Sequence, residues 1–276
     1  MLTRIITGVI GIVLAAVVIQ MGGALFSGFA LLLSLLAWFE YTRAFARKGE
    51  RLTFLLGLVG LVLLWGCSWL GNADEILAVS TGIVLLVLLM AVLLHGRVSF
   101  PAACLSIGGI FYFGYPFGHM IMLRLLYPEQ VLATPAGPMA FGCAMIWVMF
   151  LCTWASDTFA YFTGSAIGRH KLCSTISPNK TIEGFLGSVV GTTAVGAGLG
   201  RFFSLPLIEM AILGFCISIV ATLGDLVESV AKRYTGIKDS GNIIPGHGGV
   251  WDRFDSVLFT APLVYYFVLL SGVGLK

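Results

Sequence analysis

The feature that most constrains this fold is a succession of apolar runs, each long enough to cross a lipid bilayer. A membrane-spanning helix needs roughly 17 to 25 mostly apolar residues, and this chain has nine such runs. The chain is 58% hydrophobic and 11% charged, whereas about 25% of the residues in a typical soluble domain are charged. We therefore expect an all-α, polytopic integral membrane protein with about nine transmembrane helices. The predicted spans are residues 5–21, 24–40, 53–70, 76–94, 101–126, 139–164, 184–203, 206–230 and 257–274.

The positions of the basic residues predict which side of the membrane each segment faces. Cytoplasmic segments carry an excess of Lys and Arg. With the amino terminus inside, inner segments hold 13 of the 16 Lys and Arg residues, and Arg4 is one of these 13. The exceptions are Arg124, Arg201 and Lys276. This orientation places two polar segments, residues 165–183 and 231–256, on the cytoplasmic side, where they can form one site.

Two pairs of glycines have the spacing of close helix packing. Gly114 and Gly118 lie four residues apart in one apolar run, and Gly187 and Gly191 do so in another. Small residues at this spacing let two helix backbones approach each other within a membrane. We expect a neighbouring helix to lie against each pair.

Carboxylates gather at the borders of the last two spans. Asp225 and Glu228 precede Lys232 with the i, i+3, i+7 spacing of one helix face. Asp252 and Asp255 are three residues apart, just before the last span. Charges near bilayer depth are costly and usually functional, and hard cations such as Mg²⁺ bind oxygen ligands. The pattern favours Asp225 and Asp252 as metal ligands, whereas Glu228 and Asp239 fit neutralisation of nearby cations equally well.

A glycine-rich loop lies between these carboxylates. It runs from Pro245 to Gly249 and is flanked by Lys238 and Arg253. Glycine lets the backbone approach an anion closely, so the loop predicts a phosphate site. His247 has two interpretations: it orients a phosphate or a metal ligand, or it is structural.

A second polar segment precedes the seventh span. Ser177 followed by Pro178 is typical of a helix N-cap and first turn, which would place Lys180 in that first turn. A lysine there opposes the helix dipole, and this favours a bound anion nearby. The alternative is a surface lysine that reaches anionic lipid headgroups.

The carboxyl-terminal half resembles the phosphatidate cytidylyltransferases, also called CDP-diacylglycerol synthases. The lead-in Gly224-Asp225-Leu226, the Ser177–Gly184 segment and the region around Asp157 are similar to that family. Ala231 departs from the family, which usually has a bulkier apolar residue there. The signature residues are Ser229, Lys232, Arg233, Lys238, Asp239, Gly241, Ile244, Pro245, His247, Gly248, Gly249, Val250, Asp252, Arg253, Phe254 and Asp255.

This resemblance implies an enzyme of the bacterial inner (cytoplasmic) membrane with its active site at the cytoplasmic face. It implies transfer of a cytidylyl group from CTP to phosphatidic acid, which yields CDP-diacylglycerol and pyrophosphate. It further implies Mg²⁺, a second cation such as K⁺, and a homodimer. No nucleic-acid partner is expected. On this basis we expect amino-terminal transmembrane helices over residues 1–135 and a catalytic transmembrane domain over residues 136–276.

The predicted site combines residues from both polar segments. Asp225, Lys238, Asp252 and Arg253 are the expected catalytic residues. Asp225, Asp252 and Asp255 are the expected metal ligands. The expected substrate-binding residues are Ser177, Lys180, Lys232, Arg233, Asp239, His247, Gly248 and Gly249.

Two other functions remain open at this stage. A CTP-dependent polyprenol or phytol kinase would transfer the γ-phosphate of CTP to an alcohol. An ion-coupled transporter would use Asp157, Asp225 and Glu228 as ion sites within interrupted helices. No internal repeat supports the transporter, and it leaves the Lys/Arg–Gly loop unexplained. A CDP-alcohol phosphotransferase is disfavoured because its acidic motif is absent.

Overall fold

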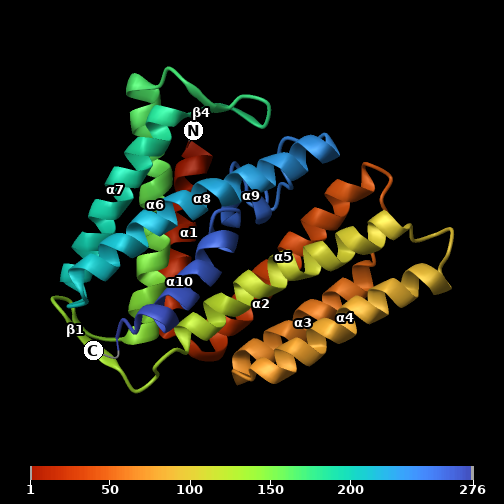
Figure 1. Ribbon diagram of the computed structural model, residues 1–276, viewed down its shortest axis with the longest axis horizontal. Helices are drawn as coiled ribbons and strands as arrows, with labels where there is room; N and C mark the ends of the chain where they lie inside the picture. The colour runs from red at the N-terminus through yellow and green to blue at the C-terminus, as the bar shows by residue number, and fades with distance from the viewer. Residues whose placement is uncertain (1, 275–276) are drawn as a thin grey trace. The chain divides into compact units, whose positions relative to one another are not determined.

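The computed structural model describes residues 2–274, and for residues 2–5 and 73 it describes the backbone alone. The side chains of Arg4 and Lys276, which entered the orientation argument, lie outside the described residues. Two short antiparallel hairpins interrupt an otherwise helical chain (Figure 1). The helices are α1 (Leu2–Met21), α2 (Gly23–Ala46), α3 (Phe54–Leu70), α4 (Ala73–Leu93), α5 (Phe100–Arg124), α6 (Phe141–Ile167), α7 (Ile182–Phe202), α8 (Leu207–Thr235), α9 (Trp251–Phe254) and α10 (Val257–Ser271). The strands are β1 (Val131–Thr134), β2 (Gly137–Ala140), β3 (Lys171–Cys173) and β4 (Ser177–Thr181).

Each predicted span corresponds to an apolar helical segment. Within the described residues, seven segments are long and apolar enough to cross a membrane, the last of them running through α9 and α10 as Trp251–Ser271. Two shorter apolar helices, Ile6–Met21 and Phe54–Leu70, match the first and third predicted runs. The prediction of an all-α polytopic membrane protein is confirmed, with seven to nine spans.

The chain divides into two compact units, which do not follow the order of the sequence. The first unit comprises Met1–Met122 and Ala231–Phe254, and the second comprises Leu123–Val230 and Asp255–Lys276. The segment that carries the signature loop therefore packs with the amino-terminal helices. The boundary predicted after residue 135 separates amino-terminal helices from a catalytic domain by function, whereas these two units are defined by packing. The functional boundary stays a prediction.

In the first unit, helices α2 to α5 pack through aromatic and small residues. Trp38 is fully buried, and its ring lies against the backbone of Gly57 on α3 and Gly109 on α5, where a Cβ atom would collide with it. Gly114 and Gly118 lie against Leu64 and Ser68 of α3, which confirms the predicted close packing.

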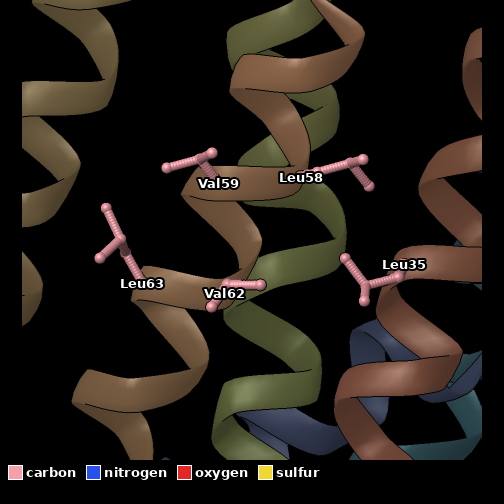
Figure 2. A pocket seen from close by; sticks show the side chains of 5 residues that line it. All are labelled: Leu35, Leu58, Val59, Val62 and Leu63. Carbon is pink, nitrogen blue, oxygen red and sulfur yellow. The ribbon is translucent and has the colours of Figure 1, made fainter.

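One groove of this unit is lined by aliphatic side chains alone. This groove of about 380 Å³ lies between α2 and α3. Figure 2 shows Leu35 on α2 turned toward Leu58 and Val62 on α3. Val59 and Leu63 complete its lining. A surface with only aliphatic side chains suits contact with lipid acyl chains.

In the second unit, α6 and α7 lie side by side along a glycine stripe (Figure 1). A Cβ atom at Gly187 would lie 2.2 Å from Thr163 Oγ1, and one at Gly191 would lie 2.3 Å from the ring of Phe159. A hydrogen bond of 2.8 Å between Ser156 Oγ and Ser188 Oγ joins the same two helices. The predicted role of the second glycine pair is confirmed as well.

This packing predicts opposite effects for two glycine-to-alanine changes on α7. Gly187→Ala places a methyl group into Thr163 and should reduce the free energy of unfolding by about 1–3 kcal/mol through overpacking. Gly198 has open space around its Cα, so Gly198→Ala should leave stability unchanged or raise it by about 1 kcal/mol. Scanning fluorimetry in detergent would compare the unfolding midpoints. Equal midpoints for Gly187→Ala and wild type would contradict the packing described.

Candidate active site

Three carboxylates converge in the second unit. Asp225 and Glu228 lie one turn apart on α8, and Asp255 lies in the turn that precedes α10. One oxygen from each of these side chains lies within 4.8 Å of the other two. Glu228 is almost fully buried at 2% exposure, and the other two are partly exposed. The spacing on α8 predicted that Asp225 and Glu228 share a face, and the structure adds Asp255 to them.

A glycine on α8 brings these segments together. A Cβ atom at Gly224 would lie 2.7 Å from the Asp255 carbonyl oxygen and 3.0 Å from Ser256 Cα. The Ser256 hydroxyl donates to the Ala221 carbonyl over 3.1 Å, and the Ser256 N–H donates to Asp255 Oδ1 over 2.6 Å. Because Gly224 lacks a side chain, the turn can lie directly on α8 and hold Asp255 beside the other two acids.

Lys180 supplies the opposite charge in this unit. Its Nζ lies 2.7 Å from Asp225 Oδ2 and 3.4 Å from the Thr222 carbonyl oxygen. Both members of the pair are partly exposed, at 23% and 34% of their side-chain area. The predicted binding residue Lys180 and the predicted ligand Asp225 are thus brought into contact.

The helix start predicted at Ser177 and Pro178 is wrong. Residues Ser177–Thr181 form β4, which pairs with β3 through Lys171↔Thr181 and Cys173↔Ser177. The cap of α7 is Thr181, whose hydroxyl accepts from the Gly184 N–H over 3.1 Å. A two-stranded hairpin has two edges, where Pro178 is tolerated. Lys180 therefore lies in a strand, one residue before the N-cap, and not in the first turn of the helix.

Glu183 holds this hairpin at its base. Its carboxylate accepts from the Arg169 N–H over 3.0 Å and from the His170 N–H over 3.2 Å. It also lies 2.6 Å from His170 Nδ1. These bonds fix the ends of the hairpin that presents Lys180.

In the first unit, Asp252 is surrounded by donors. Lys232 Nζ lies 2.9 Å from Asp252 Oδ1. Oδ2 accepts from the N–H groups of Ser240 (2.9 Å) and Gly249 (2.8 Å), and the Ser240 hydroxyl lies 3.0 Å away. Only 4% of the Asp252 side chain is exposed. In the structure this carboxylate bonds to Lys232, Ser240 and Gly249 and so connects α8 with both ends of the loop. Its role as a metal ligand stays a prediction.

The glycine-rich loop does approach anions closely, but those seen in the structure are carboxylates of the chain itself. A Cβ atom at Gly248, which has φ +86°, would lie 2.6 Å from Asp252 Oδ2. A Cβ atom at Gly249 would lie 2.4 Å from Glu40 Oε2. The prediction that these glycines bind phosphate stays untested.

A polar cavity of about 580 Å³ opens beside this loop. The predicted residues Asp239, His247, Gly248 and Arg253 all line it. Arg253 Nε donates to the His247 carbonyl over 2.8 Å, which places the guanidinium at the cavity. Arg233 and Lys238 lie on the same segment and are exposed.

Sequence reasoning missed two contacts made by amino-terminal helices. Glu40 of α2 accepts hydrogen bonds from the signature segment. The Thr7 hydroxyl of α1 donates to the Pro245 carbonyl over 3.1 Å and lies 2.9 Å from His247 Nδ1. An acid inside the apolar run 24–40 was a usable signal for Glu40, whereas a threonine in a helix carries no such signal. Asp157 lies on an exposed face of α6.

The acidic group of the second unit has the chemistry of a metal site. Carboxylate oxygens are the ligands that hard divalent cations prefer, and three of them within 4.8 Å of one another fit a single ion. Among the described residues, these three side chains form the group of Asp, Glu, His or Cys residues whose ligand atoms lie close enough together to hold a metal ion.

Comparisons with known proteins identify the family of this chain. The model of the cytidylyltransferase family matches residues 2–271. A phosphatidate cytidylyltransferase of Synechocystis sp. is 37% identical, with 97% of this chain and 96% of the relative covered. Those of Bacillus subtilis (34% identical; 97% and 97% covered) and Staphylococcus aureus (33%; 98% and 100%) are similar over nearly their full lengths. As the resemblance predicted, this chain belongs to the cytidylyltransferase family.

Proposed function

We propose that this protein transfers the cytidylyl group of CTP to phosphatidic acid, giving CDP-diacylglycerol and pyrophosphate. The observation that carries the proposal is near full-length similarity to relatives named phosphatidate cytidylyltransferase. The lysines paired with carboxylates fit the reaction, because lysine can bind the phosphates of both substrates and carboxylates can bind a divalent cation.

The reaction requires positioning more than acid–base chemistry. A phosphate monoester is largely ionised near neutral pH, so the lipid phosphate can attack without a strong base. Its oxygen forms a bond to the α-phosphorus of CTP. The bond from that phosphorus to the bridging oxygen breaks, and pyrophosphate leaves with the electron pair. The main obstacle is mutual repulsion of two polyanions, which fixed cations reduce.

We assign the basic residues of both polar segments to this task. Lys180 lies at the acidic cluster, and Arg253 lines the polar cavity with Asp239, His247 and Gly248. Arg233 and Lys238 are exposed on the adjoining segment. The proposed substrate-binding residues are Ser177, Lys180, Lys232, Arg233, Asp239, His247, Gly248 and Gly249, and Lys238 and Arg253 join Asp225 and Asp252 as proposed catalytic residues.

We also assign Mg²⁺ to the carboxylates. Asp225, Glu228 and Asp255 would hold it, because their oxygens already converge. A bound divalent ion would neutralise charge on the CTP phosphates and on the departing pyrophosphate. Asp252 stays a proposed ligand because of its place in the family signature, and K⁺ stays a proposed second cation.

The remaining assignments follow from charge and family. The distribution of Lys and Arg supports a cytoplasmic site in a bacterial inner membrane, where CTP arrives from the cytosol and phosphatidic acid from the inner leaflet. A homodimer and a catalytic domain over residues 136–276 belong to the same proposal.

The fate of each CTP phosphate tests the reaction type. With purified protein, phosphatidic acid and Mg²⁺, label at the α-phosphate of CTP should enter the lipid fraction, and label at the γ-phosphate should leave as pyrophosphate. A lipid kinase would give the reverse pattern, and a transporter would label no lipid. Reactions without phosphatidic acid provide the control.

The acidic cluster predicts a large effect of one neutral substitution. Asp225→Asn removes a proposed ligand and the partner of Lys180, so kcat should fall by about 100-fold or more. Glu129 is an exposed carboxylate of the same unit, and Glu129→Gln should retain wild-type kcat. Retention of half the wild-type activity by Asp225→Asn would remove this cluster from the site.

Metal removal gives an independent readout. Chelation with EDTA should abolish turnover, and added Mg²⁺ should restore it. Mg²⁺ should also raise the unfolding midpoint of the wild type, because a ligand that binds only the folded state stabilises it. The midpoint of Asp225→Asn should not respond. Full activity in EDTA would overturn the metal assignment.

A further inference from the structure

A carboxylate in an amino-terminal helix has its hydrogen-bond partners in the signature segment. Glu40 lies in α2, within a run that can span the membrane, and is 2% exposed. A buried carboxylate is costly unless donors surround it. Glu40 therefore needs hydrogen-bond donors, and these must lie beside its position on α2.

Within the described residues, the hydrogen-bond donors to Glu40 come from the segment that carries the signature. Oε1 accepts from the Val250 N–H over 3.0 Å. Oε2 accepts from the Trp251 N–H over 2.9 Å and from the Ser240 hydroxyl over 3.0 Å. These residues lie 200 or more positions from Glu40 in the sequence. One side chain thus holds both ends of the loop that contains the glycines and His247.

Ser240 connects Glu40 to Asp252. Its hydroxyl lies 3.0 Å from Glu40 Oε2 and 3.0 Å from Asp252 Oδ2, and its N–H donates to the same Asp252 oxygen. Asp252 in turn pairs with Lys232. The polar chain Glu40–Ser240–Asp252–Lys232 therefore runs from α2 to the carboxyl-terminal end of α8.

Two glycines of the signature make room for Glu40. A Cβ atom at Gly241 would lie 2.5 Å from Glu40 Oε1. One at Gly249 would lie 2.4 Å and 2.5 Å from its two oxygens and 2.2 Å from the Ser240 hydroxyl that donates to Glu40. Any side chain at either position would displace the carboxylate, so the loop is shaped around it.

Aromatic packing fixes the same contact. Trp251, fully buried, lies with its ring centre 5.3 Å from that of Tyr41, the neighbour of Glu40 on α2. Phe113 of α5 meets Trp251 edge-on at 5.9 Å. The end of the loop at Trp251 therefore contacts α2 in two ways, through its N–H to Glu40 and through its ring to Tyr41.

We propose that Glu40 is a positioning residue of the cytidylyltransfer reaction, which holds the loop at residues 240–252 in the conformation that presents Asp252, His247 and Arg253. This inference rests on the proposed function. Glu40 acts through the loop and is not assigned contact with either substrate. Supporting residues of this kind typically change activity by about 10–100-fold when replaced.

The test compares Glu40→Gln with Glu50→Gln. The glutamine keeps the size of Glu40 but has one acceptor oxygen, so at least one loop donor loses its partner. Glu50 follows α2 and accepts from the Ser99 hydroxyl over 3.0 Å, so its replacement removes the same charge away from the loop. We expect kcat to fall about 10–100-fold in Glu40→Gln, with KM for either substrate within about threefold, and no change in Glu50→Gln.

Hydrogen–deuterium exchange supplies a readout that needs no turnover. Peptides covering residues 240–252 should exchange faster in Glu40→Gln than in wild type, while peptides from α4 in the same unit should not change. Unchanged exchange at residues 240–252 would overturn the proposal, and so would an increase spread over the whole unit. If the wild type fails to transfer cytidylyl groups, the proposed function fails, but the exchange result still decides whether Glu40 anchors the loop.

Ser240→Ala provides the second variant if Glu40→Gln does not fold. It removes only the hydroxyl between Glu40 and Asp252, and both carboxylates keep their backbone donors. We expect a fall in kcat of about 10-fold and faster exchange confined to the loop. Wild-type kcat together with wild-type exchange would contradict the proposed link.

Discussion

The structure depends on donors for carboxylates that lie among membrane helices. Glu40 and Asp252 are nearly buried, and each accepts hydrogen bonds from several separate groups of the chain. A buried charge without such partners is strongly destabilising. The segments that supply these donors are therefore held in one conformation. In this protein the requirement to satisfy buried charge shapes the loop that carries the family signature.

The two compact units have different parts of the polar chemistry. The first holds the signature loop, its cavity and the Lys232–Asp252 pair. The second holds the acidic group and the Lys180–Asp225 pair. In both, a lysine already neutralises an acid assigned to the site. Phosphate anions that bound these lysines would compete with the carboxylates, so the proposed substrate binding would be coupled to release of the acids within each unit.

Features that depend on neighbouring residues in the sequence could be predicted from the sequence alone. Run length and hydropathy predicted the helices, glycine spacing predicted the close contacts at Gly187 and Gly191, and helical periodicity placed Asp225 beside Glu228. The β3–β4 hairpin was missed because Ser177 and Pro178 also fit a helix start, and only the pairing with β3 decides between them. The contacts of Glu40 join residues 200 positions apart, and no local spacing encodes them.

The glycines of the signature show why a motif can be recognised correctly and explained incompletely. Glycine beside Lys and Arg suggests room for a bound phosphate. At Gly241, however, the space is taken by the carboxylate of Glu40, and at Gly249 it is taken by that carboxylate together with the Ser240 hydroxyl. The requirement for glycine therefore comes in part from α2, outside the motif. Since α2 and the loop constrain each other, the amino-terminal helices contribute to the conformation of the signature loop as well as to insertion in the membrane.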